Sequence, residues 1–177
     1  MRNFHISRVF PKIDFLQWLK QCFLLFGMAG FLFVFLHPGD AWAYSTNQAA
    51  TMVLGQQNFT TSGFGAGTTL MNGPYGIAGD ASHIYVADGN NRVLIFTPNP
   101  PGTGAAANLV LGQTNFANVN NNQGGAPSSI TLNLPQAVFS DGVTLYVVDS
   151  GNNRVLIFKT IPTTIDQAAD FVIGQPS

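Results

Sequence analysis

The sequence predicts an all-β fold made of repeated units of four short antiparallel strands, and three observations predict it. A motif of twelve or thirteen residues is written twice, at residues 85–96 and 146–158. A second marker, Val-Leu/Ile-Gly-Gln, occurs three times and follows nearly the same spacing. After residue 44, no stretch has the 3.6-residue apolar period of an amphipathic helix. These features are typical of a β-strand repeat protein.

The two markers share one period. Tyr85 and Tyr146 are 61 residues apart, and Val110 and Val172 are 62 residues apart. The first Val-Leu-Gly-Gln marker begins at Val53, which is 57 residues before Val110. Two independent markers with a common spacing identify an internal repeat, and each repeat of this kind is a structural unit that stacks on its neighbours.

Each full unit, about 74–113 and about 135–175, divides into four runs rich in Val, Ile, Tyr and Phe. Gly, Pro, Asn and Asp separate the runs, as they separate strands in β proteins. Residues 49–56 carry the first Val-Leu-Gly-Gln marker and are expected to form a lone outer strand. The strands of the full units are expected at 75–80, 83–88, 92–96, 108–113, 136–141, 144–149, 154–158 and 170–175.

Both faces of such a sheet are apolar. Val93 and Ile95 point to one face, and Leu94 and Phe96 point to the other. A sheet of this kind needs a neighbour on each side, and packing sheets face to face around an axis supplies both neighbours, as in a β-propeller. The sequence therefore predicts a partial propeller of about two and a half blades in residues 44–177.

Two and a half blades cannot close a ring, and an open propeller leaves sheet edges and faces uncovered. Two explanations remain open at this point. The chain is a fragment of a longer reading frame, which is the favoured interpretation, or several chains assemble into one ring.

The strands and turns resemble the NHL repeat family. The matching residues are Pro74-x-Gly76-Ile77-Ala78, then Ile84 to Asp88, then Asn91-Arg92-Val93. The second copy keeps the last two elements but has Gln-Ala-Val at 136–138 where the first has Gly-Ile. The resemblance implies a propeller, commonly six-bladed, that is used mostly to bind proteins, RNA or carbohydrate-like ligands.

The N-terminal segment, residues 1–43, has the three parts of a secretory signal peptide. Residues 22–36 are fifteen uncharged residues that follow Lys20, and a small-x-small sequence ends at Ala43. As a helix at ~1.5 Å per residue they would span about 22 Å, short of the ~30 Å hydrocarbon core of a bilayer. We expect cleavage after Ala43, a secreted or periplasmic protein and no membrane contact after cleavage. An uncleaved signal anchor is the alternative.

Charge is scarce after the predicted cleavage site. The chain from Tyr44 has three basic residues against six Asp, and it contains no Glu. This balance offers no basic surface for nucleic acid. No nucleic-acid partner is therefore expected.

One polar set recurs at the turn between the second and third strands of both units. Gly and Asn accept positive φ at low cost, and an Asp side chain can bond nearby backbone N–H groups. These residues either line a ligand or cation pocket or hold the turn and join neighbouring strands. Their presence in each repeat favours the structural role. They are Asp88, Asn90, Asn91, Arg92, Asp149, Asn152, Asn153 and Arg154.

The long connections at 58–72 and 115–133 are expected at the same end of the sheets as these turns, and loop insertions gathered at one end of a repeat scaffold often form the binding face. Only His83 among the histidines follows Ala43, and no Cys does, so no catalytic residue, metal or cofactor is predicted. The expected function is a binding scaffold for a protein or glycan. The alternative is part of a metal-dependent lyase- or hydrolase-like propeller enzyme, of which the amidating lyases are one class, with its site in blades outside this sequence.

Overall fold

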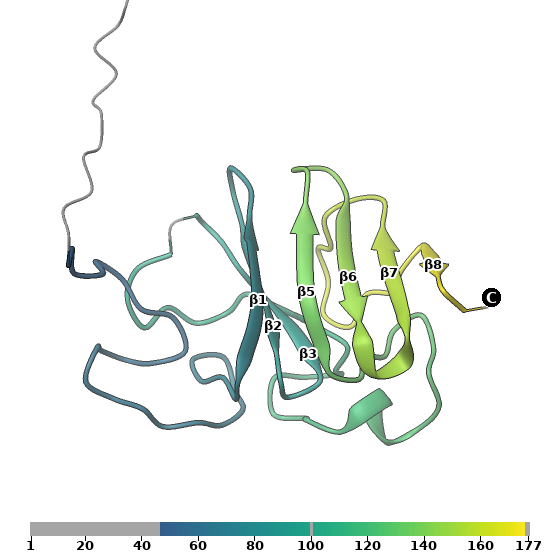
Figure 1. Ribbon diagram of the computed structural model, residues 1–177, viewed down its shortest axis with the longest axis horizontal. Coiled ribbons are helices and arrows are strands. Elements are labelled where there is room, and N and C mark those ends of the chain that lie inside the picture. The colour runs from purple at the N-terminus through teal and green to yellow at the C-terminus, as the bar shows by residue number, and fades with distance from the viewer. Residues whose placement is uncertain (1–46, 100, 176–177) are drawn as a thin grey trace, which may run out of the picture. The chain divides into compact units, whose positions relative to one another are not determined.

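A computed structural model of the chain describes residues 47–99 and 101–175, and the predicted signal peptide lies outside them. The described residues fold as two four-stranded antiparallel sheets in which consecutive strands are neighbours (Figure 1). Sheet 1 is β1–β4 and sheet 2 is β5–β8. The strands are β1 Pro74–Gly79, β2 Ile84–Asp88, β3 Arg92–Phe96, β4 Leu109–Leu111, β5 Pro135–Ser140, β6 Leu145–Asp149, β7 Arg154–Phe158 and β8 Phe171–Ile173.

The expected all-β class and the two four-stranded units are confirmed. The helices in the described residues are two short 3₁₀ segments, η1 at Asn121–Gly124 and η2 at Ser150–Asn152. Within those residues, no helix has the length and apolar character needed to cross a bilayer.

The expectation of a strand at 49–56 is wrong, because no strand forms there in the structure. Its counterparts β4 and β8 are strands because each pairs with the third strand of its own sheet. Residues 49–56 have no such third strand among the described residues. Leu54 instead packs its side chain against an apolar cluster on sheet 1.

The two sheets repeat each other residue by residue. Asp88 pairs with Arg92 across β2 and β3, and Asp149 pairs with Arg154 across β6 and β7. The register shifts at the start of both first strands, just after Pro74 and just after Pro135. The sequence repeat is therefore also a repeat of strand pairing.

The sheets pack face to face around one apolar core, and β1 and β5 lie side by side (Figure 1). Burial of each such Val, Leu, Ile or Phe side chain contributes about 1.5–3 kcal/mol. The fully buried members include Tyr85, Ala87, Val93 and Ile95 from sheet 1 and Leu145, Val147, Leu156 and Phe158 from sheet 2.

The two faces that meet are not equivalent. Leu156 belongs to the shared core, whereas its counterpart Leu94 belongs to a separate cluster on the other side of sheet 1. Conversely, Ile95 lies in the shared core, whereas its counterpart Ile157 does not. The face of sheet 1 that carries Ile95 therefore packs on the face of sheet 2 that carries Leu156, and these two faces are not equivalent in the repeat. The two units are thus stacked head to tail.

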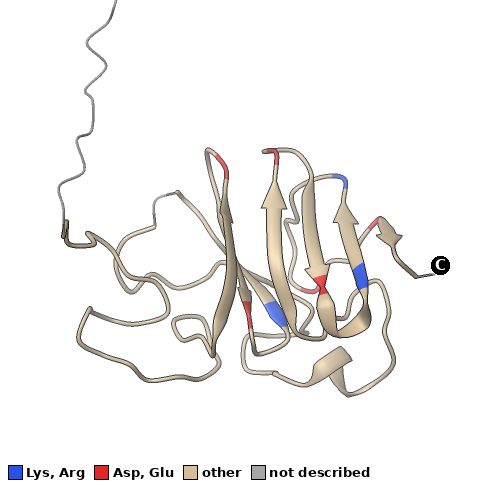
Figure 2. Cartoon of the chain, viewed as in Figure 1, with Lys and Arg blue, Asp and Glu red and all other residues tan. Residues whose placement is uncertain are grey.

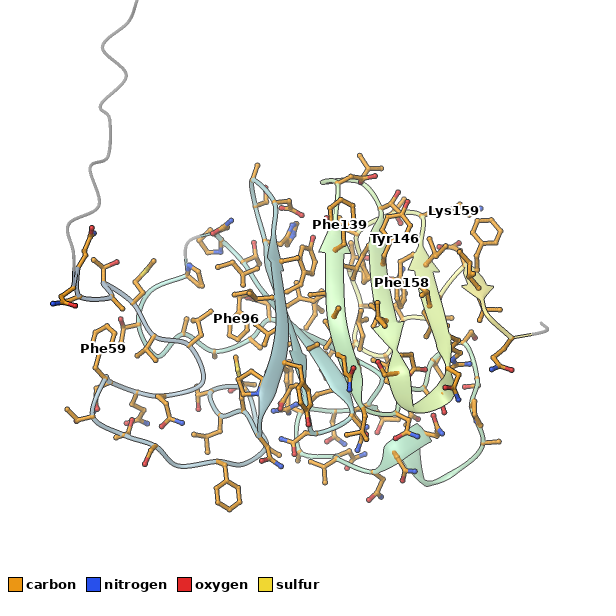
Figure 3. All side chains as sticks on the ribbon, in the orientation of Figure 1. Phe59, Phe96, Phe139, Tyr146, Phe158 and Lys159 are labelled. Carbon is orange, nitrogen blue, oxygen red and sulfur yellow. The ribbon has the colours of Figure 1, made fainter. Side chains whose placement is uncertain are left out.

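The separate cluster on sheet 1 includes Phe96, which Figure 3 labels. Residues outside the sheet cover this cluster, since Met71 and Ala107 are buried in it and Leu54 and Phe116 pack against it. The connections before and after sheet 1 thus replace part of a neighbouring sheet.

Gly76 in β1 allows the two sheets to approach closely. A Cβ atom at this position would lie 2.6 Å from the Gln136 backbone oxygen and 2.8 Å from the Ala137 Cα. Both atoms belong to the backbone of β5, so no side-chain rotation can relieve the overlap. Only glycine fits this approach of β1 to β5.

We expect Gly76→Ala to lower the free energy of unfolding by about 1–3 kcal/mol, because an inserted methyl group forces the packed sheets apart. Gly102→Ala is the matched control, since a Cβ atom there meets nothing within 4 Å. Urea unfolding followed by circular dichroism measures both. Equal stability of the two variants would contradict the close approach of the sheets.

Candidate functional site

The repeated polar residues gather at one end of the two sheets. An acidic and a basic position meet at the lower end of each sheet in Figure 2. The turn between β2 and β3 and the turn between β6 and β7 lie there, beside the connections 58–72 and 115–133. The structure therefore brings together the turns and the long connections that the sequence predicted to share one end.

The centre of the first set is a buried ion pair. Arg92 and Asp88 are 0% exposed, and the Arg92 Nε atom donates to the Asp88 Oδ2 atom over 2.7 Å. The rest of the guanidinium donates to backbone carbonyls, at 3.1 Å to Gly67, 2.6 Å to Phe116 and 2.9 Å to Leu70. A charge can be buried only when it is paired and hydrogen-bonded in this way. Arg92 thereby holds both long connections to sheet 1.

The Asp88 carboxylate completes the network from its other oxygen. Its Oδ1 atom accepts the backbone N–H of Asn72 at 2.8 Å and that of Asn90 at 3.3 Å. The Asn90 side chain then donates to the Gly65 carbonyl at 2.7 Å. Each of these bonds ends on the connection before β1 or on the turn itself.

The second set repeats this arrangement with fewer contacts. The Arg154 Nε atom donates to the Asp149 Oδ2 atom over 2.8 Å, and its guanidinium donates to the carbonyls of Ser128 and Thr131. Asp149 also accepts the Asn133 N–H at 2.7 Å. Asn152 donates to Asp149 and also to the Asn122 side chain, both at 2.8 Å, which joins the turn to η1.

Asn91 and Asn153 occupy the same left-handed position, with φ of 59° and 54°. The Asn91 side chain links the units, because it accepts the Leu134 N–H and donates to the Val119 carbonyl, both at 2.8 Å. Asn153 is exposed, and within the described part of the chain its side chain has no equivalent of these two bonds.

All eight predicted residues thus lie at this end. Seven of them use their side chains to hold turns and connections through hydrogen bonds within the chain. The connection 58–72 presents two aromatic side chains to solvent, Phe64 at 79% exposed and the exposed Phe59, which Figure 3 labels to the side of sheet 1. Neither aromatic residue is among the predicted site residues, although an aromatic residue among Gly, Ser, Thr and Asn is a visible signal of a binding surface in the sequence.

A second polar cluster lies at the opposite end and centres on Asp80. Its carboxylate accepts hydrogen bonds from the Tyr85 hydroxyl, from Ser140 in β5 at 3.3 Å and from the backbone of Ser82 and His83 at 2.8 Å. The His83 Nδ1 atom lies 3.1 Å from it. His83 lies at the start of the strand expected at 83–88, but in the structure it precedes β2 and belongs to this cluster.

The donors around Asp80 change its acidity. Burial by itself favours the neutral acid, but the hydrogen bonds from Tyr85, Ser82 and His83 outweigh burial and hold the pKa of Asp80 well below its usual range. Burial first, and then the Asp80 carboxylate, raise the pKa of the Tyr85 hydroxyl. The cluster is therefore an ionised carboxylate held by hydrogen-bond donors from both sheets.

No set of three or more His, Cys, Asp or Glu side chains is placed to hold a metal ion in the residues that the structure describes. The chain matches no known protein-family model and no curated protein.

We expect Asp88→Asn to lower the free energy of unfolding by about 3–5 kcal/mol, because it leaves the buried Arg92 charge without its counter-ion. Asp141→Asn is the matched control, since Asp141 is exposed and its side chain accepts only the backbone N–H groups of its own turn. Thermal or urea unfolding of both variants provides the measurement. A loss at Asp88 no greater than that at Asp141 would show that the buried pair does not hold this end together.

The low pKa of Asp80 predicts a pH dependence. A carboxyl whose pKa is lower in the folded state stabilises the fold above its unfolded pKa, near ~4, and loses that contribution as the pH falls below it. Asp80→Asn should therefore be less stable than the unmodified protein at pH 7. Urea unfolding between pH 5 and pH 2 should show this difference shrinking toward the acid end, and a difference independent of pH would contradict the assignment.

Proposed function

We propose that the chain is a secreted or periplasmic binding scaffold of the NHL-repeat type, in which each four-stranded sheet is one blade of a β-propeller. Its ligand is a protein or a glycan, recognised at the end of the sheets that carries the long connections. The observation that carries this proposal is the network of buried Asp–Arg pairs, which holds two long polar connections in place while leaving their outer surface free.

The head-to-tail packing of the sheets supports the propeller. Because the two sheets meet through non-equivalent faces, a third sheet could pack on sheet 2 in the same way as sheet 2 packs on sheet 1. Repeating that rotation from sheet to sheet generates a ring. The close approach at Gly76 brings β1 and β5, the first strands of the two sheets, together. In a β-propeller, the inner strands of neighbouring blades lie together around the central axis in the same way.

The place of residues 52–54 also supports it. The Gly104 N–H donates to the Val53 carbonyl at 3.0 Å, and the equivalent Asp166 N–H donates to the Val110 carbonyl of β4 at 2.9 Å. Val53 and Val110 are counterparts in the repeat. Residues 52–54 thus lie over sheet 1 as β4 lies over sheet 2, in the position of an outer strand from a preceding blade.

The chemistry of the connection end suits recognition. Binding residues are concentrated on loops that a rigid scaffold positions, and aromatic side chains contribute strongly to binding energy. Phe59 and Phe64 stand exposed on the connection that Arg92 and Asn90 hold. The signal-peptide pattern of residues 1–43 supports an extracytoplasmic location for this surface.

The test compares binding by the unmodified chain with binding by the double variant Phe59→Ser, Phe64→Ser on an array of defined glycans and peptides. Loss of the aromatic surface should weaken binding at least about tenfold, the effect of about 1.4 kcal/mol. Both residues are exposed, so the fold should be unaffected, which circular dichroism checks.

Val143→Ser is the matched control, because Val143 is equally apolar and exposed but belongs to the turn between β5 and β6 at the other end. It should bind as the unmodified chain does. Binding that survives in the double variant, or that is lost in the control, would contradict recognition at the connection end.

A further inference from the structure

The outer face of sheet 2 is an exposed apolar surface. Phe139 in β5 is 59% exposed and lies beside Tyr146, with ring centroids 5.9 Å apart (Figure 3). Val148 in β6 and Phe171 and Ile173 in β8 are also exposed. These five residues form the outer face. Contiguous apolar surface of this kind marks an interaction site.

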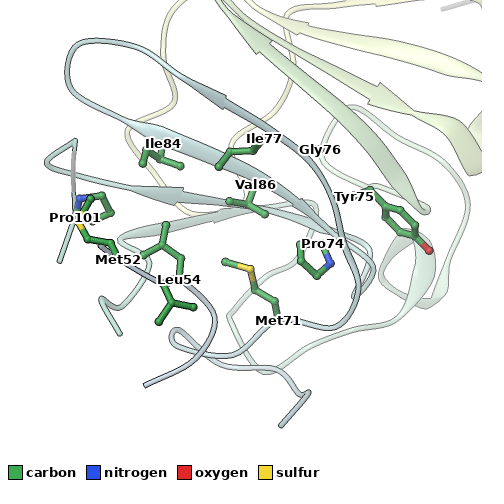
Figure 4. Close-up of a pocket in the computed structure, with 11 residues that line it drawn as sticks. Met52, Leu54, Met71, Pro74, Tyr75, Gly76, Ile77, Ile84, Val86 and Pro101 are labelled. Carbon is green, nitrogen blue, oxygen red and sulfur yellow. The ribbon is translucent and has the colours of Figure 1, made fainter. Parts of the chain in front are cut away.

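The opposite side of the unit carries an apolar cavity of about 470 Å³, between sheet 1 and the residues before it (Figure 4). Ile77 in β1 is on its wall and is 68% exposed. The cavity is also lined by Met52, Leu54, Met71, Ile84 and Val86.

The internal repeat shows what such a cavity accepts. Ile77, Ile84 and Val86 correspond to Val138, Leu145 and Val147 in sheet 2. In sheet 2 these positions are 9%, 0% and 0% exposed, because sheet 1 packs on them. The wall of the cavity therefore has the same kind of surface as the half of the shared core that sheet 2 supplies.

The outer face of sheet 2 corresponds to the half of the shared core that sheet 1 supplies. Tyr146 and Val148 are the counterparts of Tyr85 and Ala87, which are fully buried where sheet 1 covers sheet 2. Each end of the described unit thus offers one half of an interface that is already formed once inside it. We propose that a second copy of this chain docks here head to tail, with the outer face of sheet 2 of one copy against the cavity of the next.

The outer face of sheet 2 carries larger side chains in its first strand than the equivalent face of sheet 1 does. Ala137 replaces Gly76, and the Phe139 ring replaces the methyl group of Ala78. Ala137 keeps the two first strands further apart than Gly76 does, and the larger Phe139 side chain fills the wider gap. A cavity in place of a closed surface on sheet 1 accommodates that ring.

One exchange accompanies docking. β8 of the incoming copy and residues 53–56 of the receiving copy would take the same place, and they carry nearly the same sequence, Val-Ile-Gly-Gln and Val-Leu-Gly-Gln. β8 is paired with β7 along its length, whereas Val53 has a single backbone bond to Gly104. Residues 53–56 are therefore the ones displaced, and the wall of the cavity that belongs to sheet 1, at Ile77, Ile84 and Val86, receives the outer face.

Because the interface joins two different surfaces, a docked pair still has one free outer face, on one copy, and one free cavity, on the other. Association then continues until a ring closes or a chain of copies forms. This inference rests on the packing of the two sheets and is independent of the ligand proposed above.

The test uses two variants of the full chain, each blocked on one side. Phe139→Asp places a charge on the outer face, and Ile77→Asp places a charge in the cavity, where burial of an unpaired carboxylate opposes docking. Both side chains are exposed in the single unit, so both variants should fold. Size-exclusion chromatography with light scattering should show concentration-dependent association of the unmodified chain, weakened at least about tenfold in each variant.

Mixing the two variants is the decisive step. The Ile77→Asp variant keeps an intact outer face and the Phe139→Asp variant keeps an intact cavity, so the mixture should form a dimer of one copy of each and nothing larger. Recovery of association also proves that both variants are folded. Val143→Asp is the control and should associate as the unmodified chain does.

Ala137→Gly should strengthen association, because it removes the methyl group that separates the first strands. An unmodified chain that stays monomeric, or a mixture that stays monomeric, would overturn the proposal. Equal association of all variants would also overturn it, since that result places the contact outside these two surfaces. Loss of ligand binding with association retained would contradict only the proposed function.

Discussion

Each sheet of this protein has two apolar faces, and this constraint governs the rest of the structure. Such a sheet is stable only with a neighbour on both sides, because either face left in water forfeits the free energy of burying its Val, Leu, Ile and Phe side chains. The shared core, in which Leu156 and Ile95 come from opposite kinds of face, satisfies the constraint once. The connections that carry Met71 and Phe116 satisfy it in part on the far side of sheet 1. The outer face of sheet 2 and the cavity beside Ile77 are what remains.

The polar chemistry divides between the two ends of the sheets according to what each end must hold. At the connection end, Arg92 binds three backbone carbonyls, so long polar segments keep one conformation without forming strands. At the other end, Asp80 accepts donors from sheet 1 and from Ser140, which joins the sheets directly. Both networks bury charge with its partners. The exposed side chains of the connections and the apolar faces of the sheets take no part in either network.

The strands could be predicted from the sequence because their signals are local. Alternating apolar residues and Gly, Asn or Pro at the turns locate β1 to β8, and the Asp-Gly-Asn-Asn-Arg motif locates the tight turn at Asn91. The role of Arg92 could be predicted only in outline, because its acceptors are carbonyl groups, which every residue has. The Asp80 cluster was not found, since Ser140 is sixty residues away from Asp80 and becomes its neighbour only when the sheets pack.

Sequence alone thus determined the eight strands of the two sheets, where their turns lie and that the two units are equivalent, because these depend on contacts between residues close together in the chain. The tertiary structure decided which face of each sheet is covered, that residues 49–56 do not form a strand, and why Gly76 must be glycine. Those outcomes depend on which backbone approaches another across the core. Equivalent residues of the two repeats therefore differ in burial, because sheet 1 is covered by sheet 2 on one face and sheet 2 is covered by sheet 1 on the opposite face.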